Sequence, residues 1–115
     1  MKCETLDVWK RACKLSTEIY QVMHQCKDFG FKDQITRSGL SIASNIAEGI
    51  ERKSIKERKR FLDIALGSAA ELKTQTYIGM KIDYIKRDNG MKWTKELEEL
   101  RRMITALSEN MHDSQ

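Results

Sequence analysis

The feature that most constrains the fold is a glycine-bearing seam between residues 35 and 49. Its members follow one another at steps of four, three, four and three, which places them along one side of a helix. Glycine inside a helix costs about 1 kcal/mol relative to alanine, so two glycines in one seam predict that a neighbouring helix approaches this side closely. The seam consists of Ile35, Gly39, Ile42, Ile46 and Gly49.

A second row of the same helix carries short polar side chains at Ser38, Ser41, Asn45 and Glu48. Such groups need water or partners on another helix, so we expect Asn45 and Glu48 to hold helix contacts rather than perform chemistry. Glu48 and Glu71 could instead face each other as paired carboxylates, but the nearby Arg37, Asn45 and Ser68 favour a structural polar network. The predicted structural motif contains Arg37, Ser41, Asn45, Glu48, Gly49 and Glu71.

Apolar residues at three- and four-residue steps continue along the whole chain and predict four helices. We expect them at about residues 5–27, 34–51, 54–86 and 92–111. The predicted seams outside the second helix are Val8, Ala12, Leu15, Ile19, Val22 and Cys26 in the first, Leu62, Ala65, Ala69, Leu72, Thr76 and Gly79 in the third, and Trp93, Leu97, Leu100, Ile104, Leu107 and Met111 in the fourth.

The helix boundaries rest on capping and turn signals. Gly30 suits the left-handed position after a helix end, and Asp33 can cap the second helix. Ser54 and Glu57 form a capping-box pattern at the start of the third helix, and Arg-Asp-Asn-Gly at 87–90 predicts the last turn.

The long third helix carries a further apolar row at Ile78, Ile82 and Ile85, rotated away from its main seam. A single partner surface would not need both rows. The helix therefore either curls around its neighbours or meets another subunit at its far end.

Four amphipathic helices joined by short turns predict an all-α fold, an antiparallel up-down-up-down four-helix bundle. The 115 residues suffice for a single domain, 1–115, and the chain contains no proline. No apolar run approaches the roughly 20 residues of a membrane span, and the start resembles no signal peptide, so a cytoplasmic protein is expected. Cys3, Cys13 and Cys26 lack metal-site spacing and are expected to be reduced thiols.

Residues 51–60 carry six basic and two acidic side chains, a net +4 that equals the formal charge of the whole chain. We name this segment the basic corner. It predicts contact with nucleic-acid phosphates, or alternatively only a solvated face. Phe61 is the only aromatic residue beside it, which argues against base stacking and favours contact without sequence specificity. The candidate nucleic-acid-binding residues are Arg52, Lys53, Lys56, Arg58, Lys59 and Arg60.

Catalytic and metal-binding patterns are weak. Dinuclear sites in bundles use two Glu-x-x-His motifs, whereas only Glu109 and His112 have this spacing and His24 has Gln21 at the matching place. Ser41 lacks the strand-turn-helix setting of a nucleophile elbow, and no glycine-rich phosphate loop occurs. We therefore expect a protein that is not an enzyme, with no metal and no cofactor.

One run of residues is similar to a known family. Ser-Ile-Ala-Ser-Asn-Ile-Ala-Glu-Gly at 41–49, with Gln-Ile-Thr-Arg-Ser at 34–38 before it and Phe-Leu-Asp-Ile-Ala-Leu-Gly-Ser-Ala-Ala-Glu-Leu at 61–72 after it, resembles the four-helix-bundle proteins encoded by intervening sequences inside bacterial 23S ribosomal RNA genes. The resemblance covers about residues 6–110. The family often has proline where Ala43 stands.

The chain is similar, more distantly, to the accessory proteins of diversity-generating retroelements. The resemblance implies a homo-oligomer, a pentameric ring of bundles with a basic surface, and a role that involves nucleic acid or a reverse transcriptase partner. Two functions stay open at this point: an oligomeric binder of RNA or DNA without sequence specificity, and an oligomeric adaptor whose partner is a protein such as a reverse transcriptase.

Overall fold

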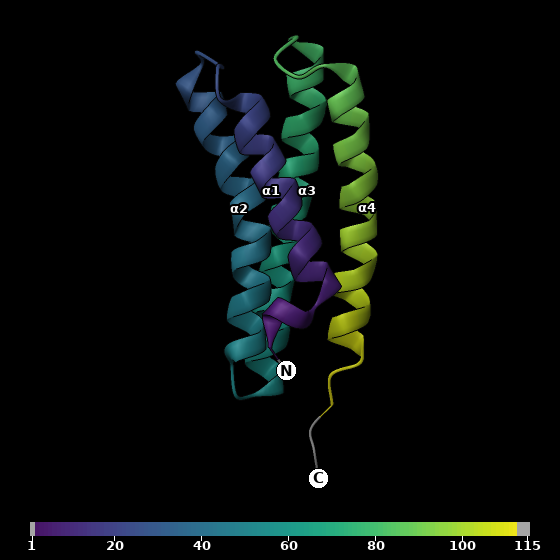
Figure 1. The fold of residues 1–115 in the computed structure, drawn as a ribbon. Helices are drawn as coiled ribbons and strands as arrows, with labels where there is room; N and C mark the ends of the chain where they lie inside the picture. The colour runs from purple at the N-terminus through teal and green to yellow at the C-terminus, as the bar shows by residue number, and fades with distance from the viewer. Residues whose placement is uncertain (1, 113–115) are drawn as a thin grey trace.

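The structure, a computed structural model, describes residues 2–112, which form four long helices after one short 3₁₀ helix, η1 (Cys3–Thr5). The long helices are α1 (Asp7–Met23), α2 (Phe29–Glu51), α3 (Ile55–Lys81) and α4 (Arg87–Glu109). Consecutive helices run in opposite directions (Figure 1), and no strand occurs in this part of the chain. The predicted all-α, up-down-up-down bundle is confirmed, with extents of 53 × 22 × 21 Å.

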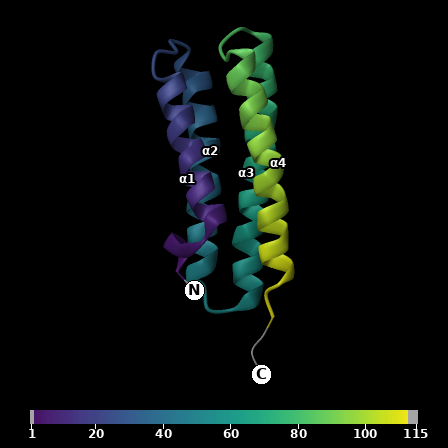
Figure 2. The same cartoon turned by 45° about the vertical axis from the view of Figure 1, so that its right-hand side comes forward.

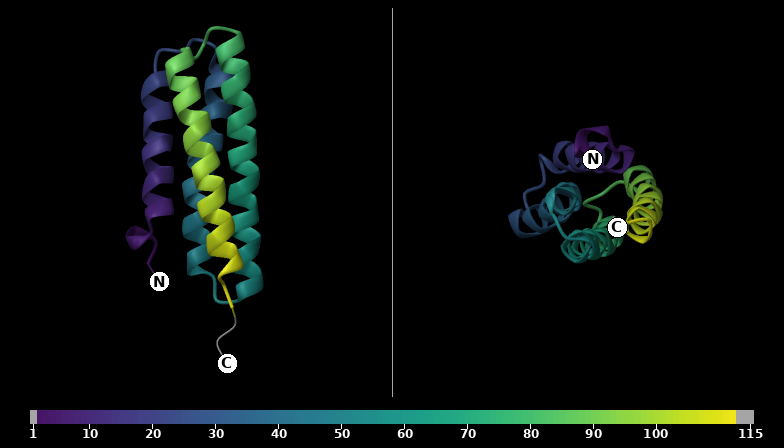
Figure 3. Two further views of the ribbon diagram at one scale, coloured as in Figure 1. Left: turned by 90° about the vertical axis from the view of Figure 1, so that its right-hand side faces the viewer. Right: turned by 90° about the horizontal axis from the view of Figure 1, so that it is seen from below.

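The four helices surround one core in the order α1, α2, α3, α4 when seen along the bundle (Figure 3). Ile35, Ile42 and Ile46 are fully buried on the predicted seam of α2. A Cβ added to Gly39 would lie 3.3 Å from Ile19 Cδ1, and one added to Gly49 would lie 3.1 Å from the carbonyl oxygen of Arg58. The prediction that both glycines allow close helix approach is confirmed.

The boundary between α1 and α2 differs from the prediction. α1 ends at Met23, and α2 begins at Phe29 because the carboxylate of Asp28 accepts a hydrogen bond of 3.1 Å from the backbone N–H of Phe31. Asp28, not Asp33, is therefore the cap. Gly30 lies inside α2 with a negative φ, so its assignment to a left-handed position was wrong.

The early end of α1 also changes its seam. Met23 is buried, whereas the predicted Val22 is exposed and Cys26 lies half-buried in the turn. The remaining four seam residues of α1, and all six of α3, are buried as predicted.

The boundary between α3 and α4 differs as well. The predicted start of α3 at Ser54 is confirmed, since Ser54 Oγ accepts a hydrogen bond of 3.1 Å from the N–H of Glu57 and caps the helix. However, α3 ends at Lys81 and the chain turns at Asp83, whose φ is +64°. The predicted turn at 87–90 is instead the first turn of α4.

This tight turn folds Ile85 back into the core, against the space left by Gly79, where an added Cβ would overlap the Ile85 side chain. Ile85 is 2% exposed, whereas Ile78 and Ile82 are 48% and 46% exposed. The predicted second row of α3 is therefore exposed at two positions and wrong at Ile85, because the helix ends before it.

The short helix η1, the end of α4 and the link between α2 and α3 lie at one end of the bundle, and the other two links lie at the opposite end (Figure 2). Within residues 2–112, no helix combines the length and hydropathy needed to cross a bilayer.

Candidate functional site

The basic corner is the short link between α2 and α3 together with the first turns of α3. Arg52 ends α2 in an extended conformation, and Ser54 caps α3 two residues later. The two caps leave only Lys53 between them. This compact link brings the six cations of the corner to one end of the molecule.

Arg52 holds the link in place. Its guanidinium pairs with the Glu48 carboxylate at 2.5 Å and lies 4.8 Å from the centre of the Phe61 ring. Its carbonyl oxygen accepts a hydrogen bond of 2.6 Å from Arg58 Nε. Arg52 and Arg58, both predicted to bind nucleic acid, are thus engaged by the protein itself.

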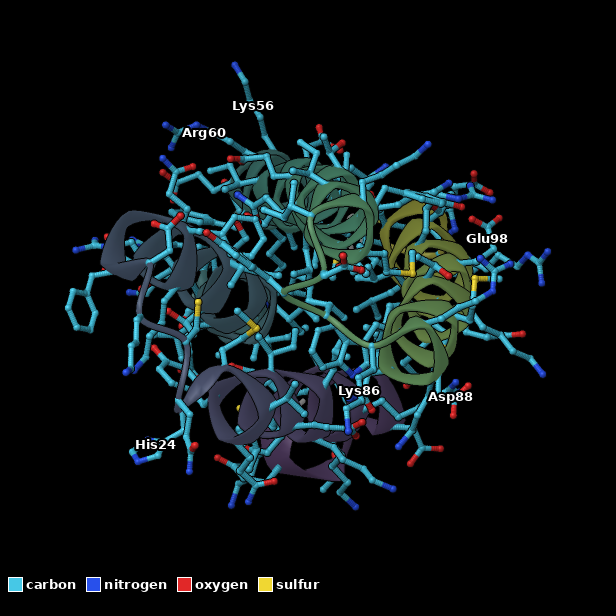
Figure 4. The ribbon with its side chains drawn as sticks, turned by 90° about the horizontal axis from the view of Figure 1, so that it is seen from above. His24, Lys56, Arg60, Lys86, Asp88 and Glu98 are labelled. Atoms are coloured by element: carbon cyan, nitrogen blue, oxygen red, sulfur yellow. The ribbon has the colours of Figure 1, made fainter. Side chains whose placement is uncertain are left out.

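The other four cations of the corner project from this scaffold. Lys53, Lys56 and Arg60 are exposed and Lys59 is half-buried, and Lys56 and Arg60 point away from the bundle on the same side (Figure 4). Within the described residues, none of the four lies within 4 Å of a carboxylate. We name Lys53, Lys56, Lys59 and Arg60 the outer cations.

Two further features bear on what the outer cations can bind. They surround the N-terminus of α3, where the helix dipole disfavours positive charge and favours an anion. The Phe61 ring lies under two guanidinium groups, since Arg60 is 5.6 Å from its centre and Arg52 is closer still. The ring is thus half-buried and already contacted by two arginines, which agrees with phosphate contact rather than base stacking.

The polar row of α2 makes fewer contacts between helices than expected. Ser41 Oγ and Ser68 Oγ of α3 share a hydrogen bond of 2.8 Å. Asn45 Nδ2 donates to the carbonyl oxygen and to the hydroxyl of Ser41, at 2.8 and 2.9 Å. Asn45 is half-buried, so it fixes the serine that makes the link to α3.

The wider network predicted around this row is not formed. Glu48 pairs with Arg52 on its own helix, and Arg37 pairs with Asp33 one turn before it. Glu71 is exposed and makes no ion pair with any residue of the described chain. The expectation that Glu48 joins two helices was wrong, because its carboxylate forms an ion pair with Arg52, one turn later in the chain.

The sequence did not predict the cleft of about 610 Å³ between α1 and α4. Arg11 donates to both carboxylate oxygens of Glu96, at 2.6 and 2.8 Å, and Lys92 pairs with Glu18 at 2.9 Å. Hydrogen bonds from Lys92 and from the Trp93 indole lower the pKa of the Glu18 carboxyl, although partial burial opposes them. The two partners of each ion pair lie far apart in the sequence, so the spacing of residues along a helix could not predict these pairs.

Candidate metal ligands do not come together in the described chain. Within residues 2–112, no three His, Cys, Asp or Glu side chains are grouped closely enough to hold a metal ion. His24 projects outward at the end of α1 (Figure 4), and Ser41 is committed to Asn45 and Ser68. His112 is exposed just after the end of α4.

The family model of the 23S rRNA-intervening sequence protein matches residues 4–106. A crystal structure of a protein of unknown function from the S23 ribosomal protein family of Bacteroides thetaiotaomicron is similar in fold, with a TM-score of 0.83 and 24% identity over 90% of this chain and 99% of that one. None of the curated proteins matches the sequence.

Proposed function

The chain belongs to the family of 23S rRNA-intervening sequence proteins, and from that premise we propose that it is a non-enzymatic, oligomeric protein that binds RNA or DNA without reading the base sequence. The basic corner is the binding surface, and its outer cations contact the phosphates. The observation that carries the proposal is the cluster of four cations near the N-terminus of α3, three of them exposed, that make no ion pair within the described chain.

Charge alone gives such a surface its affinity and its lack of specificity. Cations that neutralise phosphates release condensed counterions, so binding weakens steeply as the salt concentration rises. Phe61, the aromatic residue next to the outer cations, is half-buried and contacted by two arginines. Phosphate contacts carry no base information. The ligand is therefore a phosphate backbone.

Assembly would multiply the effect of one corner. The ring that the family resemblance implies holds five copies, whose formal charges of +4 sum to +20. A polyanion that spans several corners binds more tightly than one corner allows, because each further contact is intramolecular. We propose a homopentamer for this reason.

The experiment compares two variants of equal charge. One replaces Lys53, Lys56, Lys59 and Arg60 with glutamine; the control replaces Lys27, Lys81, Lys86 and Arg87, which are exposed and lie at or near the opposite end of the bundle. Each variant loses four positive charges, so its formal net charge falls from +4 to zero. Arg52 and Arg58 are left in place because they hold the link.

Gel-shift assays at low salt should show binding of structured RNA by the unmodified protein and by the control, and loss of binding by the outer-cation variant. Two RNAs of equal length and unrelated sequence should bind alike. If the unmodified protein leaves both RNAs free, or if the two variants bind equally, the corner is not a nucleic-acid surface.

A second candidate function is an oligomeric adaptor for a protein partner such as a reverse transcriptase. It is favoured by exposed apolar side chains toward the end of the bundle opposite the basic corner, among them Val22, Tyr77 and Met91. In this case the protein would bind its partner equally well after replacement of the outer cations, and the gel-shift assay would show no complex with either RNA.

A further inference from the structure

The outer sides of α2 and α3 each carry an exposed stripe that no part of the described chain covers. The members of a stripe are spaced by three, four, seven or eight residues, which keeps them on one side of a helix. The α3 stripe consists of Ile64, Gly67, Glu71, Ile78 and Ile82. The α2 stripe consists of Phe29, Arg37, Leu40, Ser44, Ala47 and Glu51, of which only Ala47 is half-buried.

The α3 stripe has the character of a helix contact. Ile64, Ile78 and Ile82 are between 40% and 48% exposed, although each could bury a large apolar side chain. Gly67 lies in the middle of α3, where a Cβ would meet nothing within 4 Å. Packing within the chain therefore gives no reason for this helix-weakening residue, whereas the backbone of a second helix lying on the stripe would.

Two contacts fix the register of α2 and α3, that is, which of their residues lie at the same level along the bundle axis. The hydroxyls of Ser41 and Ser68 meet, and Gly49 lies against the backbone of Arg58. The helices are antiparallel, so residues 37, 44 and 51 of α2 lie level with about residues 72, 65 and 58 of α3. A neighbouring copy standing the same way up would present its α2 stripe at these heights.

In that arrangement the residues of the two stripes that lie level with one another are complementary in charge or in apolar character. Glu71 is level with Arg37, so opposite charges meet. Phe29, 72% exposed, is level with the stretch between Ile78 and Ile82, so apolar side chains meet. If the neighbouring copy were upside down, rotated about the middle of α3, its Glu51 would lie level with the apolar Ile78 of the first copy. That orientation would therefore match less well.

The lower half of the stripes matches too. Ile64 and Gly67 are level with the small or apolar residues from Leu40 to Ala47.

We propose that the α3 stripe of one copy packs against the α2 stripe of the next copy, both standing the same way up, with Glu71 facing Arg37 across the interface. Arg37 is available for this contact, because its pair with Asp33 leaves the arginine side chain 76% exposed. The proposal deepens the self-association within the proposed function by naming the surface.

The arrangement also determines the kind of assembly. The two stripes are exposed on two different helices, α2 and α3, which lie side by side in the bundle (Figure 3). The interface is therefore heterologous, and each copy can bind a neighbour through each stripe. Because the matching levels coincide, no shift along the bundle accumulates from copy to copy. The absence of such a shift is what a closed ring requires, whereas a helical filament needs one.

Charge reversal tests the interface, with the mass measured by light scattering after size-exclusion chromatography. The unmodified protein should be assembled, and Arg37→Glu or Glu71→Arg alone should reduce the mass toward the 13.4 kDa of one chain. The double variant should assemble again. Lys95→Glu, a reversal on the outer side of α4, should leave the mass unchanged, and circular dichroism should show every variant folded.

Mixing distinguishes the interface from an ion pair inside one chain. Equal amounts of the two single variants should form complexes of at least two chains, because the carboxylate introduced at position 37 of one variant then faces the guanidinium introduced at position 71 of the other. A pair within one chain would be restored in the double variant but not in the mixture. Gly67→Gln, whose Cβ would meet nothing within 4 Å in its own copy, should also lower the mass without loss of helicity.

The inference is overturned if the unmodified protein has the mass of one chain at tens of micromolar, if both single reversals stay assembled, or if the double variant recovers and the mixture does not. Loss of RNA binding has no part in this test. If the masses follow the expectation but the unmodified protein binds no RNA, the interface stands and the proposed function fails.

Discussion

Ser41 of α2 and Ser68 of α3 share a hydrogen bond of 2.8 Å between their hydroxyl oxygens, halfway along the bundle. Asn45, one turn after Ser41, donates to that same hydroxyl at 2.9 Å. This small network is what the polar row of α2 contributes between helices. It also sets the register of the two helices whose link forms the basic corner.

The first prediction concerns this network. Replacement of Ser41 and Ser68 with alanine, separately and together, should give a coupling free energy of about 1 kcal/mol, the usual net value of a hydrogen bond. Asn45→Ala should destabilise by roughly 1–3 kcal/mol, because it leaves the partners on Ser41 unmatched. Urea unfolding measures all four, and strictly additive serine variants would show that the hydroxyl contact contributes nothing.

The second prediction compares two glycines of neighbouring helices. Gly49→Ala should destabilise by about 1–3 kcal/mol, because its Cβ would press on the backbone of Arg58 and cannot move away. Gly67→Ala should stabilise the isolated copy by up to about 1 kcal/mol, the difference in helix propensity. The second change is measured in the Arg37→Glu background, where assembly does not contribute. Effects of the same sign at both positions would contradict the account.

Comparison of these glycines shows what the sequence could predict. The spacing of Gly39 and Gly49 within an isoleucine seam predicted close packing, because periodicity reports which side of a helix is buried. The sequence could not distinguish Gly79, which makes room for Ile85, from Gly67, which faces nothing in its own chain. That difference depends on where α3 ends, and the end is set by Asp83 at φ +64°.

The sequence predicted which residues form the basic corner, but not which of its cations hold the link and which are available to a ligand. Clustering of charge identified the basic corner, since net charge needs no coordinates. Which cations remain available depends on contacts with Glu48 and Phe61, and these require the helix directions. The sequence did not identify Asp28 as the cap of α2, because Gly30 indicates a helix end. Glycine is nevertheless tolerated in the first turn of a helix that an aspartate caps.

The third prediction separates Arg52 from its neighbour. Arg52→Gln should destabilise by about 1 kcal/mol, because it loses the contact with the Phe61 ring and the ion pair with Glu48. Lys53→Gln should change stability by less than about 0.5 kcal/mol, as exposed positions usually do. Thermal and urea unfolding measure both, and equal effects would show that Arg52 does not hold the link.

The fourth prediction concerns acid. Lys92 and Trp93 lower the pKa of Glu18 below its ordinary 4.5, so the unfolded chain binds this proton more tightly than the folded one. The stabilisation is therefore complete above about pH 4.5 and is lost as the pH falls through the lower folded-state pKa. In Glu18→Gln the unfolding free energy should depend less on pH below 4.5. An unchanged acid profile would refute the role of Glu18.

The most direct test of the central claim is the salt dependence of RNA binding, followed by fluorescence anisotropy of one labelled duplex. The logarithm of the affinity should fall linearly with the logarithm of the salt concentration. Replacing Lys53, Lys56, Lys59 and Arg60 with glutamine should reduce that slope by roughly 3–4 for each corner engaged, at about 0.9 per lost phosphate contact. The control with Lys27, Lys81, Lys86 and Arg87 replaced should keep the slope of the unmodified protein. Equal slopes for the two variants would contradict the assignment of the basic corner as the nucleic-acid surface.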